Sequence, residues 1–342
     1  MLGAIIEYFA FFVQSTILLT FLFAVRRYRA VVVHGPPEPL VFAAFLAKAF
    51  RRRVILDIRD RSADLFEIRA PDSRTARLPN RVLTSLERLA TSFADVVTTV
   101  HEPYREALMR NRIPKEKIAI VMNTLPTNVE RAVRRTIGGS STFDITYHGT
   151  LSTVYGVDIL IAAFVEVRSM LTDARLNIFG DGAARRNLVE RAEASGASQS
   201  IFFSEGFLDH DHVLTLIRDT KVGVIPNHTG RINQFALPTK LFDYVALRVP
   251  VIATSLPTIR AHFDENEVLY VPPGDPHALA QALLDVARDP QAAAARAAAA
   301  HARYRHAYRW ERSAGAFLEA IGGPTATGEQ LVRVPTGRTR QI

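Results

Sequence analysis

The sequence predicts an α/β fold made of two doubly wound units, each with a parallel sheet covered by helices. Apolar runs of four to six residues alternate with helical stretches along most of the chain, which is typical of buried parallel strands. A stretch rich in Arg, Gly and Ser, at about 130–142, interrupts this alternation, which then restarts. Two such units in succession place the expected ligand crevice between them.

Size and composition agree with this architecture. The chain has 342 residues, of which 48% are hydrophobic and 22% charged, so one large or two medium globular domains are expected. It has no cysteine, which excludes disulfide bonds and thiolate chemistry and fits a reducing compartment.

The positive charge is concentrated in the first part of the chain. Residues 1–140 hold 22 Lys and Arg against 13 Asp and Glu, whereas the remainder holds 20 against 21. Such a face suits an anionic lipid or a phosphate-bearing acceptor, and it can equally be a solvated surface. No nucleic-acid motif accompanies it, so a nucleic-acid partner is not expected.

Residues 8–25 carry no charged side chain and are followed by Arg26 and Arg27. This length just reaches that of a membrane-spanning helix. Polar residues such as Gln14 dilute it, and a strand-like run starts at Ala30, which leaves little room for a membrane exit. We expect a buried or interfacial helix, with a true span as the alternative. A cleaved signal peptide is not expected, because a basic n-region is missing.

The elements before the linker follow from short apolar runs and helical periodicity. The predicted strands are 30–34, 54–58, 95–100 and 117–123. An apolar helix is predicted to run through Phe50, and two more over 81–93 and 103–111, while a polar loop with prolines is expected over about 59–80.

The same alternation predicts the second unit. Its strands are expected at 143–149, 175–180, 200–206, 222–226, 249–254 and 267–271. Helices are expected between them, including 211–219 and 239–247, and then over 276–288, from about 291, and over 310–321. The last 20 residues are rich in Gly, Thr and Arg and are predicted to be disordered.

The segment 235–254 carries the strongest functional signal. Leu237, Pro238 and Thr239 open a short helix that holds Lys240 in its first turn and Asp243 about one turn later. The start of a helix offers unpaired N–H groups and partial positive charge, which suits a diphosphate, and a carboxylate nearby suits a polyol. An ordinary helix-to-strand connection remains the other interpretation.

Two joints between a strand and a helix are rich in small residues. Gly180, Asp181 and Gly182 form one, and 148–156 the other. Loops at the carboxyl ends of parallel strands bind ligands in such folds, although glycines also serve tight turns.

Other candidates follow strand ends in the first unit. His34 ends one strand, and Arg59 and Asp60 follow another, so they either face a crevice or are structural. The run 208–213 alternates Asp and His without the usual spacing of metal ligands, so a helix cap is expected there and no metal site.

Taken together, these segments resemble the family 4 glycosyltransferases, which are retaining enzymes of the GT-B fold. The matching segments occur in the family's order over about 30–320, and the most specific are YHGTLSTVYGVDILIAAF, NIFGDGAARRNL and LPTKLFDYVALRVPVIA. The resemblance implies a shortened acceptor-side Rossmann-like domain over 1–138 and a domain that binds the nucleotide sugar over 139–300. It also implies that helices in 301–322 cross back to the first domain, ahead of the tail 323–342.

The resemblance also assigns roles to residues. Asp243 stands where the family has a ribose-binding glutamate, and Lys240, His34 and Arg59 are placed in the catalytic machinery. Gly35 and Asp60 belong with the acceptor side. The donor is expected near a set of loop residues, namely Gly149, Thr150, Gly180, Asp181, Gly182, Phe207, Leu208, Asn227, Arg231, Leu237, Pro238 and Thr239.

Some positions depart from the family pattern. The first member of the family's acid pair is replaced by Phe235, and the second is shortened to Asp243. Cations that the family often has at the positions of Thr150 and Tyr155 are missing, and Lys240 and Arg231 are candidates to replace them.

The implied activity is transfer of a sugar from a nucleotide-diphosphate sugar to an acceptor hydroxyl with retention, in cell-surface polysaccharide or glycolipid assembly. No metal or other cofactor is expected. The expected partners are the nucleotide sugar, a lipid-linked or glycan acceptor and an anionic membrane surface, and the expected location is the cytoplasm at the inner face of the plasma membrane. A catalytically impaired homologue that acts as a partner or binding protein, or a sugar-nucleotide epimerase on the same fold, are the alternatives.

Overall fold

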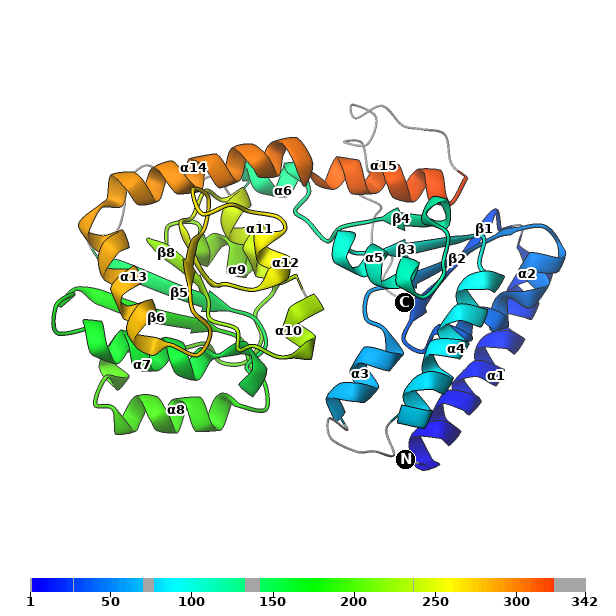
Figure 1. The fold of residues 1–342 in the computed structure, drawn as a ribbon, viewed down its shortest axis with the longest axis horizontal. Coiled ribbons are helices and arrows are strands. Elements are labelled where there is room, and N and C mark those ends of the chain that lie inside the picture. Colours follow the sequence, from blue (N-terminus) through cyan, green and yellow to red (C-terminus); the bar gives the residue numbers. More distant parts are fainter. Residues whose placement is uncertain (1, 27, 70–76, 133–141, 236, 323–342) are drawn as a thin grey trace. The chain divides into compact units, whose positions relative to one another are not determined.

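The computed structural model describes residues 2–26, 28–69, 77–132, 142–235 and 237–322. The chain divides into two compact units (Figure 1). Unit 1 comprises residues 1–123 together with residues from Glu311 onward, and unit 2 comprises residues 124–310. The domain boundary expected at 138 falls outside the described residues, as does the tail 323–342.

Unit 1 is built on a parallel sheet of four strands in the order β1-β2-β3-β4. The strands are β1 (Ala30–Gly35), β2 (Arg53–Ile58), β3 (Val96–Thr99) and β4 (Ile118–Ile120). The other elements are α1 (Leu2–Val25), η1 (Glu38–Ala44), α2 (Phe45–Ala49), α3 (Ser62–Arg69), α4 (Arg77–Phe93), α5 (Glu102–Arg110), η3 (Lys115–Lys117) and α15 (Trp310–Ala320). The apolar run of β2 is buried from Val54 to Ile58, as a central strand covered on both faces requires.

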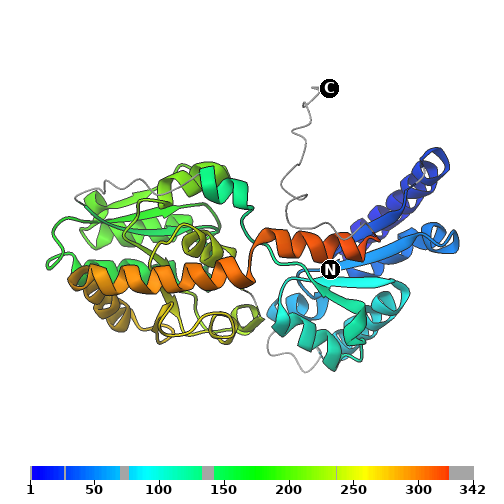
Figure 2. The same cartoon turned by 90° about the horizontal axis from the view of Figure 1, so that it is seen from above.

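Helix α1 lies at the edge of unit 1 (Figure 2) and packs on η1. Its half-buried positions include Phe12, Thr16, Leu19 and Phe23, a spacing that places them on one side of the helix. Other apolar side chains of the helix are exposed, among them Phe9, Ile17 and Phe21, and no residue of the stretch Ile6–Val25 is buried. The helix is therefore not a buried core helix, which corrects one half of the expectation for 8–25. By length and composition it is a candidate membrane span.

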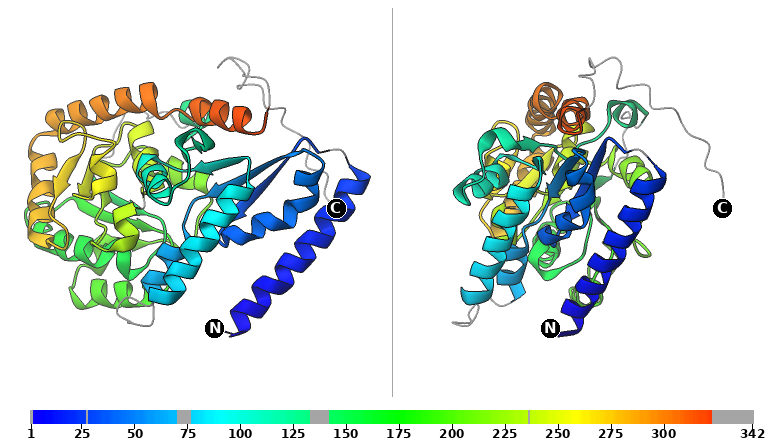
Figure 3. Two further views of the ribbon diagram at one scale, coloured as in Figure 1. Left: turned by 45° about the vertical axis from the view of Figure 1, so that its right-hand side comes forward. Right: turned by 90° about the vertical axis from the view of Figure 1, so that its right-hand side faces the viewer.

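Helix α15 belongs to unit 1 although it lies near the end of the chain (Figure 3). The backbone N–H of Met122 donates to Oγ of Ser313 over 3.0 Å. Arg53 donates to the carbonyl of Glu319 over 3.1 Å, near the end of this helix. Basic side chains favour that position because the last carbonyls of a helix lack partners within it.

Unit 2 is built on a parallel sheet of six strands in the order β10-β9-β8-β5-β6-β7. The strands are β5 (Phe143–His148), β6 (Ala174–Phe179), β7 (Ile201–Phe203), β8 (Val222–Ile225), β9 (Val251–Thr254) and β10 (Leu269–Val271). The helices are α6 (Thr127–Ala132), η4 (Thr153–Tyr155), α7 (Val157–Val167), α8 (Arg185–Ala194), η5 (Ser198–Ser200), α9 (His210–Ile217), α10 (Arg231–Phe235), α11 (Thr239–Ala246), α12 (Pro257–Arg260), α13 (Pro276–Arg288) and α14 (Pro290–Ala307).

The strand order of unit 2 reverses direction at β5. From β5 the chain continues to β6 and β7 on one side and returns to β8 on the other. In open parallel sheets the crevice at such a switch point, outside the carboxyl ends of the strands, is where ligands bind. The ends of β5 and β8, His148 and Ile225, therefore mark the candidate site within this unit.

Several elements differ from the sequence prediction. The segment 59–80 is not a loop throughout, because α3 lies within it and α4 begins at Arg77. Ser62 at the start of α3 donates its N–H and its hydroxyl to the buried carboxylate of Glu38. The helix expected to run through Phe50 consists of a 3₁₀ stretch, η1, followed by the short α2. The short helices α10 and α12 were not predicted.

Candidate functional site

Helix α11 positions the two residues singled out from the sequence. Its N-cap residue, Pro238, makes no capping hydrogen bond with its side chain, and Lys240 and Asp243 are both buried although both are ionisable. Tyr244 anchors the helix, since its hydroxyl donates to the carbonyl of Thr146 in β5 over 2.8 Å. Gly223 in β8 makes room for that ring, because a Cβ there would lie 2.5 Å from it.

The Lys240 side chain reaches the loop that follows β5. Its Nζ lies 3.9 Å from the ring centre of Tyr147 and 5.2 Å from that of Tyr155. A Cβ added at Gly149 would lie 3.1 Å from this nitrogen, and Gly149 has a positive φ of 120°. Both constraints favour glycine here. The ammonium thus lies between two aromatic rings and bare backbone, at the carboxyl end of β5.

Burial lowers the pKa of Lys240 to about 7, against the opposing attraction of Asp243. The ring faces beside it offer partial negative charge, which favours the protonated form. At neutral pH this lysine is therefore poised between its two forms, and an anion nearby would complete its protonation.

Asp243 lies between two imidazoles. Its Oδ1 is 3.2 Å from Nε2 of His210, at the start of α9, and its Oδ2 is 3.7 Å from Nε2 of His148, at the end of β5. Burial lowers the pKa of His148 to about 4, so it is neutral at pH 7. The bond to Asp243 raises the pKa of His210.

The glycine turn after β6 packs against the loop after β5. A Cβ at Gly180 would lie 2.0 Å from the carbonyl oxygen of Gly149, and one at Gly182 would lie 2.3 Å from that of Leu151. The two loops also share hydrogen bonds, from Leu151 N to the carbonyl of Asp181 and from Gly149 N to the carbonyl of Phe179. Close packing of two backbones therefore accounts for both glycines, while the side chain of Asp181 stays half-exposed.

The loop after β8 is tied to the same region. Asn227 is buried and donates to Asn233, which in turn donates to the carbonyl of Val154 over 2.8 Å. Leu237 and Pro238 are half-buried, Thr239 and Thr150 are exposed, and Arg231 starts α10. On the loop after β7, Phe207 is exposed and Leu208 half-buried. The structure thus brings Gly149, Gly180 and α11 together, whereas the Phe207 side chain is exposed to solvent.

In unit 1 a second cluster forms at the carboxyl ends of three adjacent strands. Asp57 of β2 is buried, and its Oδ2 accepts from Nδ1 of His34 over 2.8 Å and from Nε of Arg59 over 2.9 Å. Its Oδ1 accepts from the hydroxyl of Thr98 over 2.7 Å. With Nδ1 engaged, Nε2 of His34 is left for a ligand, and the His34 side chain is 61% exposed.

The two remaining acceptor-side candidates lie nearby. Gly35 ends β1 beside His34, in register with Ile58. Asp60 is exposed and lies beside Tyr104, whose pKa is raised by burial and by the charge of Asp60. Among the residues that the structure describes, no cluster of His, Asp and Glu suits a metal ion.

Asp57, His148 and His210 belong to these clusters, although none of them was assigned an individual role from the sequence. Asp57 stands inside an otherwise apolar strand, and a buried carboxylate requires partners, so this pattern was a usable signal. His148 and His210 meet at Asp243 from β5 and α9. Only the fold brings them together, so the sequence alone held no signal for that contact.

Comparison with known proteins finds a matching family model for each half of the chain. The family model described as "Glycosyl transferase 4-like domain" matches residues 8–124, and the model "Glycosyl transferases group 1" matches residues 142–289. The glycogen synthase of Mycobacterium tuberculosis is 28% identical over 174 residues, which are 51% of this chain and 41% of that protein. The match thus spans about two fifths of the curated relative.

Solved structures show the same fold at low identity. Anabaena Alr3699/HepE in complex with UDP-glucose superposes with a TM-score of 0.66 at 17% identity, over 85% of this chain and 78% of that one. Sucrose-phosphate synthase from Thermosynechococcus elongatus gives 0.67 at 18% identity, over 93% and 77%. Together with the two parallel-sheet units, these likenesses show the GT-B fold, and the family models match a glycosyl transferase domain to a region in each half of the chain.

Proposed function

We propose that the enzyme transfers a sugar from a uridine-diphosphate sugar to an acceptor hydroxyl with retention of configuration. The observation that carries this proposal is the Lys240 ammonium, buried at the carboxyl end of β5 beside Gly149 and the uncapped start of α11. A partly desolvated cation next to bare backbone and a helix start is a site for a diphosphate.

The chemistry needs one bond to break and one to form. The bond between the anomeric carbon and the β-phosphate oxygen breaks, the bond to the acceptor oxygen forms, and the acceptor proton passes to the departing phosphate. Negative charge grows on the diphosphate as the sugar leaves, so Lys240 and the N–H groups of α11 stabilise the transition state more than the bound donor.

Lys240 also replaces the two cations that this chain lacks relative to the family pattern. The positions of Thr150 and Tyr155 often carry cations in the resembling family, and Nζ of Lys240 lies 5.2 Å from the ring centre of Tyr155. On this proposal a single buried lysine supplies that charge. Asp243, one turn further along α11, grips the ribose hydroxyls, which take the place of His210 at its Oδ1.

The choice of uridine rests on related structures. Anabaena Alr3699/HepE was solved with UDP-glucose and Staphylococcus aureus TarM with UDP, at 17% and 12% identity. The acceptor side is assigned to His34, Arg59 and the Asp57 carboxylate that holds them. The proposal requires no metal or other cofactor.

We place the reaction in the assembly of a cell-surface polysaccharide or glycolipid, at the inner face of the membrane. The exposed apolar α1 and the positive charge of residues 1–140 support a peripheral location there. An acceptor linked to a lipid is then within reach of an otherwise water-soluble enzyme.

Binding of UDP, GDP, dTDP and UDP-glucose, measured by calorimetry, tests the donor assignment. We expect UDP and UDP-glucose to bind, and Asp243→Asn to lose most of this affinity. Asp158→Asn is the matched control, because Asp158 also pairs with an imidazole, that of His228, over 3.2 Å in the same unit. Equal affinity in wild type and Asp243→Asn would contradict the placement of the donor at α11. Product analysis in the absence of an acceptor distinguishes sugar transfer from epimerisation.

A further inference from the structure

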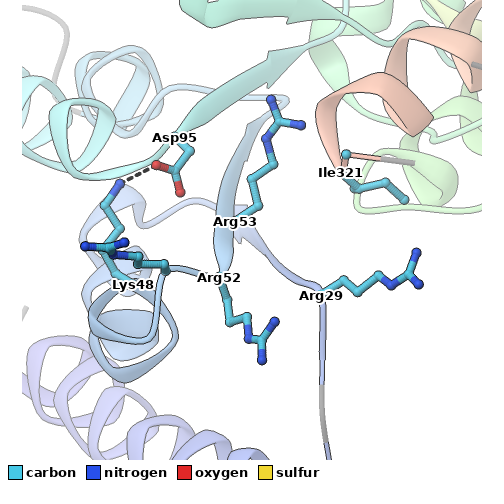
Figure 4. Close-up of a pocket in the computed structure, with 8 residues that line it drawn as sticks. Arg29, Lys48, Arg52, Arg53, Asp95 and Ile321 are labelled. Carbon is cyan, nitrogen blue, oxygen red and sulfur yellow. Dashed lines mark hydrogen bonds and ion pairs between the residues drawn. The ribbon is translucent and has the colours of Figure 1, made fainter. Parts of the chain in front are cut away.

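A strongly basic hollow lies in unit 1, at the amino-terminal edge of its sheet (Figure 4). It encloses about 630 Å³ and is lined by Arg29, Lys48, Arg51, Arg52, Arg53 and Asp95, together with residues near the end of α15. Arg29 directly precedes β1 and Arg53 begins β2. The Asp57 cluster occupies the opposite, carboxyl edge of the same sheet, so the hollow is separate from the acceptor side.

The protein supplies little negative charge to this hollow. Asp95 contacts Nζ of Lys48 over 2.5 Å and also accepts from the backbone N–H of Val54. Arg53 donates to the carbonyl of Glu319. Nε of Arg52 is buried without a hydrogen-bond partner among the described residues, which is an unusual state for such a group. The lining of the hollow therefore contains five cationic side chains and a single carboxylate, which already has partners.

One of these cations, Arg51, lies on strained backbone. Arg51 has a positive φ of 56° just after α2, where its N–H bonds to Lys48 and that of Arg52 bonds to Ala47. This is the Schellman ending of a helix, whose left-handed residue is usually glycine. An arginine there costs on the order of 1 kcal/mol of stability. A glycine would adopt this backbone conformation without that cost.

Exposed apolar groups adjoin the hollow. Phe50 is 63% exposed, immediately before Arg51, and its ring lies 5.3 Å from that of Phe23 in α1. Helix α1 presents Ile17, Phe21 and Val25 to solvent, and Arg29 follows four residues after its end. Cationic pockets beside exposed aromatic and aliphatic groups suit the boundary of a bilayer, where phosphates lie next to hydrocarbon.

We propose that this hollow binds the phosphate headgroup of an anionic membrane lipid while α1 and Phe50 enter the apolar layer beside it. The inference deepens the membrane location proposed above and depends on it. The exposed apolar side chains of Phe50 and α1 favour a lipid over a soluble phosphate as the ligand. A soluble phosphate has no apolar part that these side chains could bind. The lipid holds unit 1 by its amino edge and leaves the carboxyl edge, with His34 and Asp57, free for the acceptor.

Vesicle co-sedimentation of the full chain tests the proposal. The readout is the anionic preference, which is the partition coefficient onto vesicles of phosphatidylglycerol and phosphatidylcholine divided by that onto phosphatidylcholine alone. Replacing three cations of the hollow (Arg29→Gln, Arg51→Gly and Arg52→Gln) is expected to lower this preference by about a hundredfold, at roughly fivefold per charge.

A matched control removes the same charge elsewhere. The control variant carries Arg175→Gln, Arg186→Gln and Arg288→Gln, three positions that are exposed in unit 2. Its anionic preference is expected to stay within about threefold of the wild-type value. Ile17→Ser with Phe21→Ser is expected to weaken binding to both vesicle types alike. The single variant Arg51→Gly guards against misfolding, because it is expected to keep or raise the melting temperature and still lose part of the preference.

Two results overturn the inference. One is an unchanged anionic preference in the hollow variant, and the other is an equal loss in the control, which would mean that net charge alone drives binding. Vesicles are used without nucleotide sugar, and donor calorimetry is run without lipid. Failure of one proposal is therefore distinguishable from failure of the other.

Discussion

Nζ of Lys240 lies 3.9 Å from the centre of the Tyr147 ring, so the end of β5 provides an aromatic face for the cation that α11 presents. Tyr147 is itself fixed, because it is fully buried and its hydroxyl donates to the carbonyl of Thr150 over 2.8 Å. The position of the ammonium is therefore set by a strand, a loop and a helix before any ligand arrives. Such preorganisation is what electrostatic catalysis requires.

The buried lysine should make stability depend on pH. Its pKa is about 7 in the folded state and about 10.5 when unfolded, so the unfolded chain holds more protons between these values. The free energy of unfolding of the wild type should therefore rise with pH in this window, by up to about 1.4 kcal/mol per unit from this group. Urea denaturation of wild type and Lys240→Met between pH 7 and 10 measures it, and the difference between them should grow with pH. Parallel curves would contradict a depressed pKa.

Donor binding should take up a proton through the same group. At pH 8 most Lys240 is neutral in the free enzyme, and a diphosphate beside it restores the charged form. Calorimetry with UDP-glucose in two buffers of different ionisation enthalpy should give an uptake approaching one proton. Lys240→Met should show none and bind about 10- to 100-fold more weakly, as expected for loss of a charge-assisted bond. Equal uptake in the variant would assign the proton to another group.

Gly180→Ala should destabilise unit 2 by several kcal/mol. Its Cβ would lie 2.0 Å from the carbonyl oxygen of Gly149, and φ at this position is 151°. Gly274→Ala separates the two causes, because Gly274 also has a positive φ, of 72°, but nothing lies within 4 Å of its Cβ position. That control should lose only about 1 kcal/mol in denaturant titration. Similar losses in both would show that backbone packing is not the reason for Gly180.

Asp57→Asn should impair turnover while the fold persists. Asp57 positions His34 and Arg59 through its Oδ2, and an amide cannot accept both bonds in the same way. We expect kcat/KM to fall about tenfold or more, because the orientation of the His34 ring is no longer fixed. Asp285→Asn, at an exposed position, serves as control. A variant with normal activity would make Asp57 purely structural.

Arg61→Met should destabilise unit 1 by about 3–5 kcal/mol, since it leaves the carboxylate of Glu87 buried without its cation. The double variant Arg61→Met with Glu87→Leu should recover much of this loss, because the buried carboxylate of Glu87 is removed together with its cation. Arg186→Met breaks an exposed pair with Glu190 and should change stability by less than about 1 kcal/mol. Chemical denaturation measures all three, and an additive double variant would exclude coupling.

The sheets could be predicted from the sequence because their strands are short apolar runs that need burial on both faces. Residues 54–58 and 222–226 show this pattern directly. Helix α3 could not be predicted from the sequence, because its first residue, Ser62, is held by hydrogen bonds to Glu38 of another element. A polar segment stabilised by a distant carboxylate looks like a loop when only neighbours in sequence are compared.

The candidate site divides in the same way. Lys240 and Asp243 could be proposed from the sequence, because both lie on one short helix and the family resemblance covers that helix. The imidazoles that flank Asp243 come from β5 and α9, and no local pattern links them to it. The sequence showed the glycines at 180 and 182 but not their reason, which is the carbonyl oxygens of Gly149 and Leu151.

The backbone passes between the units twice, once after Asn123 and once near Trp310, because α15 returns to unit 1. A protease that nicks only the first passage leaves a fragment whose last helix still holds Met122 and Arg53 through Ser313 and Glu319. The nicked enzyme should then migrate as one particle under native conditions and as two bands in detergent. A severed connection would thus be masked by non-covalent complementation.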